Sequence, residues 1–175
     1  MVNNKIDNLF TKNRISRLNE LEIERYVNFF DNSYKDNLEH SKENTENFPR
    51  WSIISGYYTM HDITKLLFAK KFRLKVELKV HETTIRLLKI LIQDKELISF
   101  IEQGYNEFKN LANDLVEAKR ERVKVQYYTG TEFMKEKYKE KAKDFLQNIV
   151  MPYIEKVLRL IKWLVIYSKK MYLKY

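Results

Sequence analysis

The stretch Trp51–Lys71, WSIISGYYTMHDITKLLFAKK, decides the fold of this chain. Stepping roughly 100° per residue around a helix spreads its apolar side chains over well more than half of the circumference. These side chains are Ile53, Ile54, Tyr57, Tyr58, Met60, Ile63, Leu67 and Phe68. A helix that is apolar on nearly all sides must pack against several neighbours. The stretch therefore predicts a central helix over residues 50–72.

The rest of the chain predicts further helices around this one. Turn-forming residues are scarce, with 3 Gly and 2 Pro in 175 residues, and sheet folds depend on such turns. Apolar residues at helical spacing predict helices over residues 13–41, 81–92, 95–127 and 132–172. Pro152 should kink the last helix. Residues 73–79 alternate weakly, and we expect a loop there because a strand would have no partner.

These elements predict a single all-α domain over residues 1–175. Its architecture should be an up-and-down bundle of four long helices plus one short helix. The length of the chain is sufficient for one well-buried hydrophobic core.

Composition excludes several kinds of site. The chain has no Cys, which rules out disulfides, zinc thiolates and cysteine nucleophiles. Its three His residues are isolated in the sequence, so we predict neither a metal site nor a cofactor. The first residues, MVNNKIDNLF, lack the apolar core of a signal peptide. Charged residues interrupt the most apolar stretch, 149–167, so we expect a cytoplasmic protein without a membrane span.

The chain carries a formal charge of +9, from 33 Lys and Arg against 24 Asp and Glu. Such a charge is compatible with a polyanionic partner such as RNA. The alternative is that a composition rich in Lys, Ile, Asn and Tyr reflects an AT-rich genome. Net charge by itself leaves both interpretations open.

The helix predicted over residues 95–127 has an apolar face that turns polar near its end. The face is built by Phe108, Leu111, Ala112, Leu115 and Val116, and helical spacing continues it through Lys119, Arg122, Val123 and Gln126. A buried, unpaired charge costs several kcal/mol, so this face should end in a cleft, an interface or a bound anion. The alternative is that the helix has outrun the core and its end is solvated.

Aromatic residues accompany these cations. Arg120 and Tyr127 share an adjacent face of the helix, and Tyr128 follows directly. Rings beside guanidinium groups are suited to stacking on nucleic-acid bases. The candidate ligand-binding residues of this segment are Lys119, Arg120, Arg122, Gln126 and Tyr128.

His61 and Asp62 form a second candidate pair, in the central helix. His61 falls inside the apolar arc, and Asp62 lies at its edge. One interpretation is a core histidine that hydrogen-bonds a neighbour. The other is that both side chains contribute to a ligand-binding site.

Three motifs over residues 36–161 resemble the HEPN (higher eukaryotes and prokaryotes nucleotide-binding) superfamily. The Trp51–Lys71 stretch resembles the family's central-helix signature with its Tyr-Tyr-x-Met element. KVHETTIRLL, residues 79–88, resembles the Lys-x-His segment that opens the third helix. RVKVQYY, residues 122–128, resembles the Arg-x-x-Ala-Asp-Tyr element that ends the fourth.

The resemblance implies a bundle of four main helices plus a short one, commonly a homodimer with its polar motif near the dimer cleft. Many members are metal-independent ribonucleases, often toxins of toxin–antitoxin pairs, which use an Arg followed a few residues later by His. Related members pair with a minimal nucleotidyltransferase, and others bind nucleotides without cleaving RNA.

The chain departs from the nuclease pattern. No His follows His81, Gln126 replaces the Asp of the non-nuclease variant, and Asp62 stands where many relatives carry His. A phenol with a pKa near ~10 is a poor general base at neutral pH. Arg122 could still bind a phosphate.

We therefore predict an RNA- or nucleotide-binding protein, with a minimal nucleotidyltransferase as the partner that the resemblance implies. The first alternative is a ribonuclease toxin that uses Arg122 and Tyr127 as catalytic residues. The second alternative is a non-catalytic adaptor or dimerisation bundle.

Overall fold

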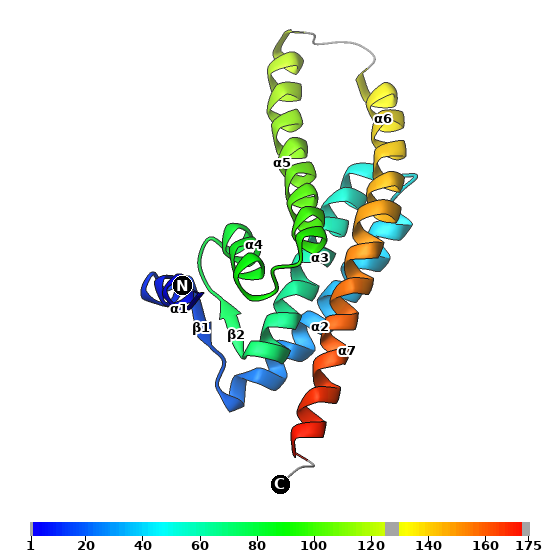
Figure 1. Cartoon of the computed structure of the whole chain (residues 1–175). Helices are drawn as coiled ribbons and strands as arrows, with labels where there is room; N and C mark the ends of the chain where they lie inside the picture. Colours follow the sequence, from blue (N-terminus) through cyan, green and yellow to red (C-terminus); the bar gives the residue numbers. More distant parts are fainter. Residues whose placement is uncertain (1, 125–129, 173–175) are drawn as a thin grey trace.

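A computed structural model of the chain describes the backbone of residues 2–124 and 130–172 and the side chains of residues 5–111 and 136–162. Helices dominate, and a short two-stranded sheet lies beside them (Figure 1). In chain order the elements are α1 Val2–Thr11, β1 Ile15–Arg17, α2 Glu20–Glu43, α3 Pro49–Phe72, β2 Leu74–Val76, α4 Val80–Leu91, α5 Lys95–Lys124, α6 Gly130–Phe145, a π-helical segment Leu146–Val150, and α7 Met151–Tyr172. The predicted all-α class is confirmed, with the small sheet as an addition.

Helix α3 is the central element that the sequence predicted. It contacts α2, α4, α5, α6 and α7, and its side chains are buried on all sides, with Tyr57, Ile63 and Phe68 each 0% exposed. Pro49 opens the helix at a position where no N–H donor is needed. Arg73, with a φ of 52°, ends it in the left-handed conformation. Helix α3 is therefore the central helix around which the other helices pack.

The predicted loop over residues 73–79 is wrong in part, because β2 forms there. Strand β2 pairs antiparallel with β1, and Ile15 lies opposite Val76 in the register. The sequence indicates no partner strand, because residues 15–17 fall within the helix predicted over 13–41. Ile15, Leu74 and Val76 are all buried, so this short sheet closes one end of the core.

The predicted helix over residues 13–41 begins later than expected. Asn13 adopts a φ of 51°, which interrupts any helix at that point. Helix α2 begins only at Glu20, where the Asn19 side chain accepts a hydrogen bond of 2.9 Å from the Glu22 N–H and caps the first turn. Helix α1 was not predicted, and its Leu9 is fully buried in the common core.

The helix predicted over residues 132–172 is interrupted by its π-helical segment, which ends two residues before Pro152. A proline removes one backbone N–H and clashes with the carbonyl four residues before it. Here the Met151 N–H bonds back to the Leu146 carbonyl, which widens the turn in front of the proline. The predicted disturbance at Pro152 therefore takes the form of a π turn that joins α6 to α7.

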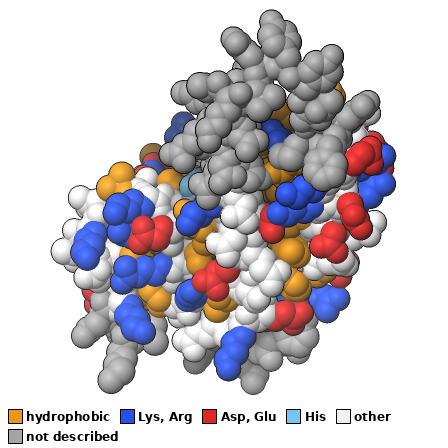
Figure 2. Space-filling view, turned by 90° about the horizontal axis from the view of Figure 1, so that it is seen from above, with side chains coloured by type: hydrophobic (Ala, Val, Ile, Leu, Met, Phe, Trp, Pro, Cys, Tyr) orange, Lys and Arg blue, Asp and Glu red, His pale blue; other side chains and the backbone are white. Residues whose placement is uncertain are grey.

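The surface carries charges of both signs. Seen from above the bundle, Lys and Arg side chains lie interspersed with Asp and Glu over the described part of this face (Figure 2). On the described part of this face, side chains of both signs are mixed, and Figure 2 shows no patch of one sign there. Among the residues that the structure describes, none of the helices combines the length and apolarity of a membrane span.

The absence of a side chain at Gly56 in α3 allows α2 and the α6–α7 junction to pack closely against this helix. A Cβ added there would lie 3.1 Å from both Phe145 Cε1 and Val150 Cγ2 and 3.2 Å from Ser41 Oγ. Because these atoms belong to buried, packed side chains, Gly56→Ala should lower the free energy of unfolding by about 1–3 kcal/mol.

Gly104→Ala is the matched control: its Cβ would lie 3.0 Å from Sδ of Met60, a buried but unbranched side chain that can change rotamer, and 3.4 Å from Tyr57 Cδ2. Alanine also has a higher helix propensity, so this variant should stay within about 1 kcal/mol of wild type. Urea denaturation followed by circular dichroism measures both variants. Equal stability of Gly56→Ala and Gly104→Ala would contradict the packing argument.

A histidine–tyrosine cluster and the groove beside it

Three helices bring a cluster of rings together at one end of the α3–α4 contact. Helix α3 contributes Tyr57, Tyr58 and His61, helix α4 contributes His81, and helix α5 contributes Tyr105 and Phe108. The rings of His61 and His81 have centroids 4.9 Å apart, and Tyr57 stacks on Phe108 at 5.0 Å. Tyr57 is fully buried, whereas Tyr58, His81 and Tyr105 are half-buried. The cluster thus runs from the core to the surface.

His61 and Asp62, two of the predicted binding residues, lie in the buried part of this region. They are 2% and 6% exposed. Asp62 Oδ2 accepts hydrogen bonds from Ser33 Oγ at 2.7 Å and from Asn37 Nδ2 at 3.1 Å, both on α2. This is the environment that the core-histidine alternative describes. A direct role of either residue in ligand binding stays a prediction.

The contacts of His61 link Asp62 on α3 to Thr84 on α4. His61 Nδ1 lies 3.5 Å from Asp62 Oδ1, and Nε2 lies 3.3 Å from Thr84 Oγ1. An acid, an imidazole and a hydroxyl in this order also occur in nucleophilic active sites. Thr84, however, is 0% exposed, so its hydroxyl cannot reach a substrate in this conformation. His61 Nδ1 forms no hydrogen bond with a described residue, so of these two His61 contacts only Nε2–Thr84 joins α3 to α4.

Both imidazoles of the cluster are held in the neutral form. Burial lowers the pKa of His61, an effect that exceeds the opposing influence of the Asp62 carboxylate. Burial also lowers the pKa of His81, and the neighbouring His61 and Lys65 add to this effect. Around neutral pH each ring therefore has one N–H donor and one nitrogen that can accept.

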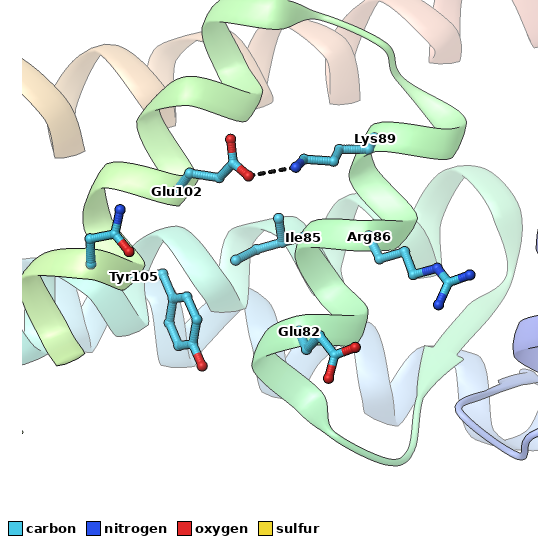
Figure 3. A pocket seen from close by; sticks show the side chains of 7 residues that line it. Glu82, Ile85, Arg86, Lys89, Glu102 and Tyr105 are labelled. Carbon is cyan, nitrogen blue, oxygen red and sulfur yellow. Dashed lines mark hydrogen bonds and ion pairs between the residues drawn. The ribbon is translucent and has the colours of Figure 1, made fainter.

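A groove of about 560 Å³ lies between α4 and α5, directly beside the cluster. Its lining residues are Glu82, Ile85, Arg86, Lys89, Glu102, Tyr105 and Asn106 (Figure 3). Lys89 reaches across from α4 to form an ion pair with Glu102 of α5. Tyr105 joins the groove to the cluster, because its ring stacks on His81 at 5.8 Å with an interplanar angle of 15°.

The groove has more free positive than free negative charge. Glu82 pairs with Arg14 at 2.8 Å, and Glu102 pairs with Lys89. Arg86 forms no ion pair with any residue that the structure describes. Lys109 places its ammonium 5.4 Å from the centre of the Tyr105 ring. The groove therefore offers a half-buried Tyr105 ring with the Lys109 ammonium beside it, whereas Arg86 lines the α4 side and points away from Tyr105 in Figure 3. Such a ring and these cations suit different parts of an anionic ligand.

The other predicted site residues lie outside the described side chains. Lys119, Arg120 and Arg122 belong to the last turns of α5, which rises above the rest of the bundle together with the start of α6 (Figure 1). Gln126, Tyr127 and Tyr128 follow that helix and lie outside the described residues altogether. The structure gives no position for any of these six side chains.

The sequence interpretation missed His81, Tyr105 and Arg86 as site residues. Of these three residues, His81 belongs to the Lys-x-His element of the KVHETTIRLL motif that the sequence indicates. The local spacing does not show that this motif packs against α5. Within residues 5–111 and 136–162, the structure contains no group of three His, Asp or Glu side chains that could hold a metal ion.

We expect the two neutral imidazoles to make the protein less stable in mild acid. The folded pKa of each is lowered, so the unfolded chain, with a His pKa near ~6.5, takes up these protons first. The free energy of unfolding should fall as the pH drops from about 7.5 to about 5.5, by up to about 1.4 kcal/mol per pH unit for the buried His61 and by less for the half-buried, solvent-screened His81.

Urea denaturation at a series of pH values measures this slope. His61→Gln should reduce the slope, whatever its effect on stability at neutral pH. The range from about pH 7.5 to 8.5 is the internal control, because both imidazoles are neutral there in the folded and the unfolded chain. A slope between pH 7.5 and 5.5 that is the same in wild type and His61→Gln would refute the assignment.

Comparisons of the chain with protein-family models, with curated proteins and with solved structures gave no match. The resemblance to HEPN proteins therefore rests on the three motifs quoted above. The functional interpretation of the groove rests on its geometry and charge.

Proposed function

We propose that the chain binds RNA or a nucleotide, with the groove between α4 and α5 as one contact site. The observation that carries the proposal is the groove itself, which the Tyr105 ring and the Arg86 side chain both line. A ring of this kind can stack on a base, and a guanidinium can hold two oxygens of a phosphate. The net charge of +9 favours the approach of a polyanion.

The basic end of α5 supports a ligand that extends beyond the groove. Lys109 and Lys119 are ten residues apart on one helix, which corresponds to about 15 Å along its axis. A short single strand is long enough to contact both. The proposal therefore includes the predicted residues Lys119, Arg120, Arg122, Gln126 and Tyr128 as a second part of the binding surface.

The geometry of the histidine–tyrosine cluster favours binding of RNA over its cleavage. RNA cleavage through the 2′-OH needs an accessible base with a pKa near neutrality. His61 is buried, and Nδ1 of His81 lies 2.8 Å from the Tyr57 hydroxyl. Of the four ring nitrogens, only Nε2 of the half-buried His81 is left at the surface without a hydrogen bond to a described residue. The ribonuclease alternative keeps Arg122 and Tyr127 as its predicted catalytic residues.

A HEPN-type bundle, a homodimer and a nucleotidyltransferase partner belong to the same proposal. The mostly helical architecture around α3 is compatible with them. They rest on the motif resemblance, and sedimentation of the purified protein is the direct test of the dimer.

Fluorescence polarisation with a labelled single-stranded RNA and with labelled AMP tests the proposed function. Arg86→Ala should weaken binding of at least one probe about tenfold, because a charge-assisted hydrogen bond to phosphate is lost. Tyr105→Ala should weaken it by a similar factor through loss of stacking. Affinity should also fall steeply with salt concentration.

Arg159→Ala is the matched control, because this exposed arginine of α7 lies outside the groove and pairs with Glu155 at 3.8 Å. Arg122→Ala tests the end of α5 separately. Absence of binding to both probes at low salt would refute the proposal. Binding that is unaffected by Arg86→Ala and Tyr105→Ala would exclude the groove.

A further inference from the structure

The Tyr57 hydroxyl is a buried group whose hydrogen bond points to a role for His81. Tyr57 is 0% exposed, and its hydroxyl oxygen lies 2.8 Å from His81 Nδ1. Phe108 and Tyr105 cover the Tyr57 ring, with centroids at 5.0 and 5.9 Å. Among the described residues, His81 is the hydroxyl's one hydrogen-bond partner.

The direction of this hydrogen bond follows from what each group must satisfy. A buried hydroxyl whose proton has no acceptor is energetically unfavourable, because water no longer satisfies it. Burial raises the pKa of Tyr57 far above that of a free phenol, so the hydroxyl keeps its proton. Because His81 Nδ1 is the available acceptor, Tyr57 donates and Nδ1 accepts. The ring proton of neutral His81 is then on Nε2.

The surroundings of His81 favour this neutral form. Burial, the His61 ring and the Lys65 ammonium lower the pKa of His81, whereas the Asp62 carboxylate raises it less strongly. Glu82, the next residue on α4, is already paired with Arg14. A cationic His81 would also require Nδ1 to carry a proton, which would leave the Tyr57 hydroxyl without its acceptor.

The outer nitrogen of His81 is available to a ligand. His81 is half-buried, and its Nε2 forms a hydrogen bond with none of the described residues. The ring stacks on Tyr105, which lines the groove. We propose that Tyr57 is a positioning residue that fixes His81 as the Nε2–H tautomer, so that His81 donates a hydrogen bond to a phosphate oxygen of the ligand. The ligand half of this inference rests on the proposed function.

Two measurements separate the tautomer from the ligand. Long-range ¹H–¹⁵N correlation of the His rings, assigned with a His81→Gln variant, reports which nitrogen of His81 carries the proton. Wild type should show the Nε2–H tautomer. In Tyr57→Phe, which removes only the hydroxyl, a substantial fraction should shift to Nδ1–H. Tyr58→Phe is the control, since the Tyr58 hydroxyl forms no hydrogen bond with a described residue, and it should leave the spectrum unchanged.

Binding of labelled AMP and single-stranded RNA tests the ligand half. Tyr57→Phe should weaken binding about three- to tenfold, which corresponds to roughly 0.6–1.4 kcal/mol. His81→Ala should weaken it at least as much. His81→Gln should keep most of the affinity, because its side-chain amide can present an N–H close to the place of Nε2–H. Circular dichroism confirms that each variant is folded.

The outcomes are distinguishable. An Nδ1–H tautomer in wild type, or an unchanged tautomer in Tyr57→Phe, overturns the role of Tyr57. Suppose that wild type shows the Nε2–H tautomer and Tyr57→Phe shows the shift, but wild type binds neither AMP nor RNA. This result overturns both the proposed function and the hydrogen bond from His81 to a ligand phosphate. Binding that depends on Arg86 and Tyr105 but not on His81 overturns the ligand half alone and leaves the proposed function intact.

Discussion

The buried side chains of α3 require neighbours on every side of the helix, because apolar area left in water costs about 25 cal/mol per Å². Helices α2, α4, α5, α6 and α7 all contact it. Where α2 and the α6–α7 junction pack against α3, Gly56 leaves no room for a Cβ without a shift of its neighbours. The wide π turn before Pro152 keeps the α6–α7 junction close to this same point. The arrangement of the other helices thus follows from the need to bury the apolar side chains of α3.

The candidate site depends on the same constraint. Tyr57 is buried because α5 covers that side of α3. His81, at the start of α4, meets it from a third helix, at the border between core and solvent. The buried Tyr57 hydroxyl can thus fix the tautomer of His81, a side chain at the surface. Precise placement of a donor by a packed scaffold reduces the entropy that a ligand-binding site loses on binding.

The sequence could predict the helices more fully than the site. The apolar arc of α3 and the scarcity of Gly and Pro were sufficient for the all-α class. The sheet was missed because Ile15 and Val76 are far apart in the chain, and three-residue strands have almost no periodicity. The groove was missed for a related reason. Arg86 and Tyr105 come to line one groove only through the packing of α4 on α5, which no local spacing encodes.

The β1–β2 ladder has a consequence for the order in which the chain folds. Strands β1 and β2 flank the whole of α2 and α3, so pairing Ile15 with Val76 closes a long loop at a high entropic cost. The contacts between α2 and α3 are more local and should form early. The ladder and α1 should then dock late, after the transition state. Weakening the ladder should accelerate unfolding and leave the folding rate nearly unchanged.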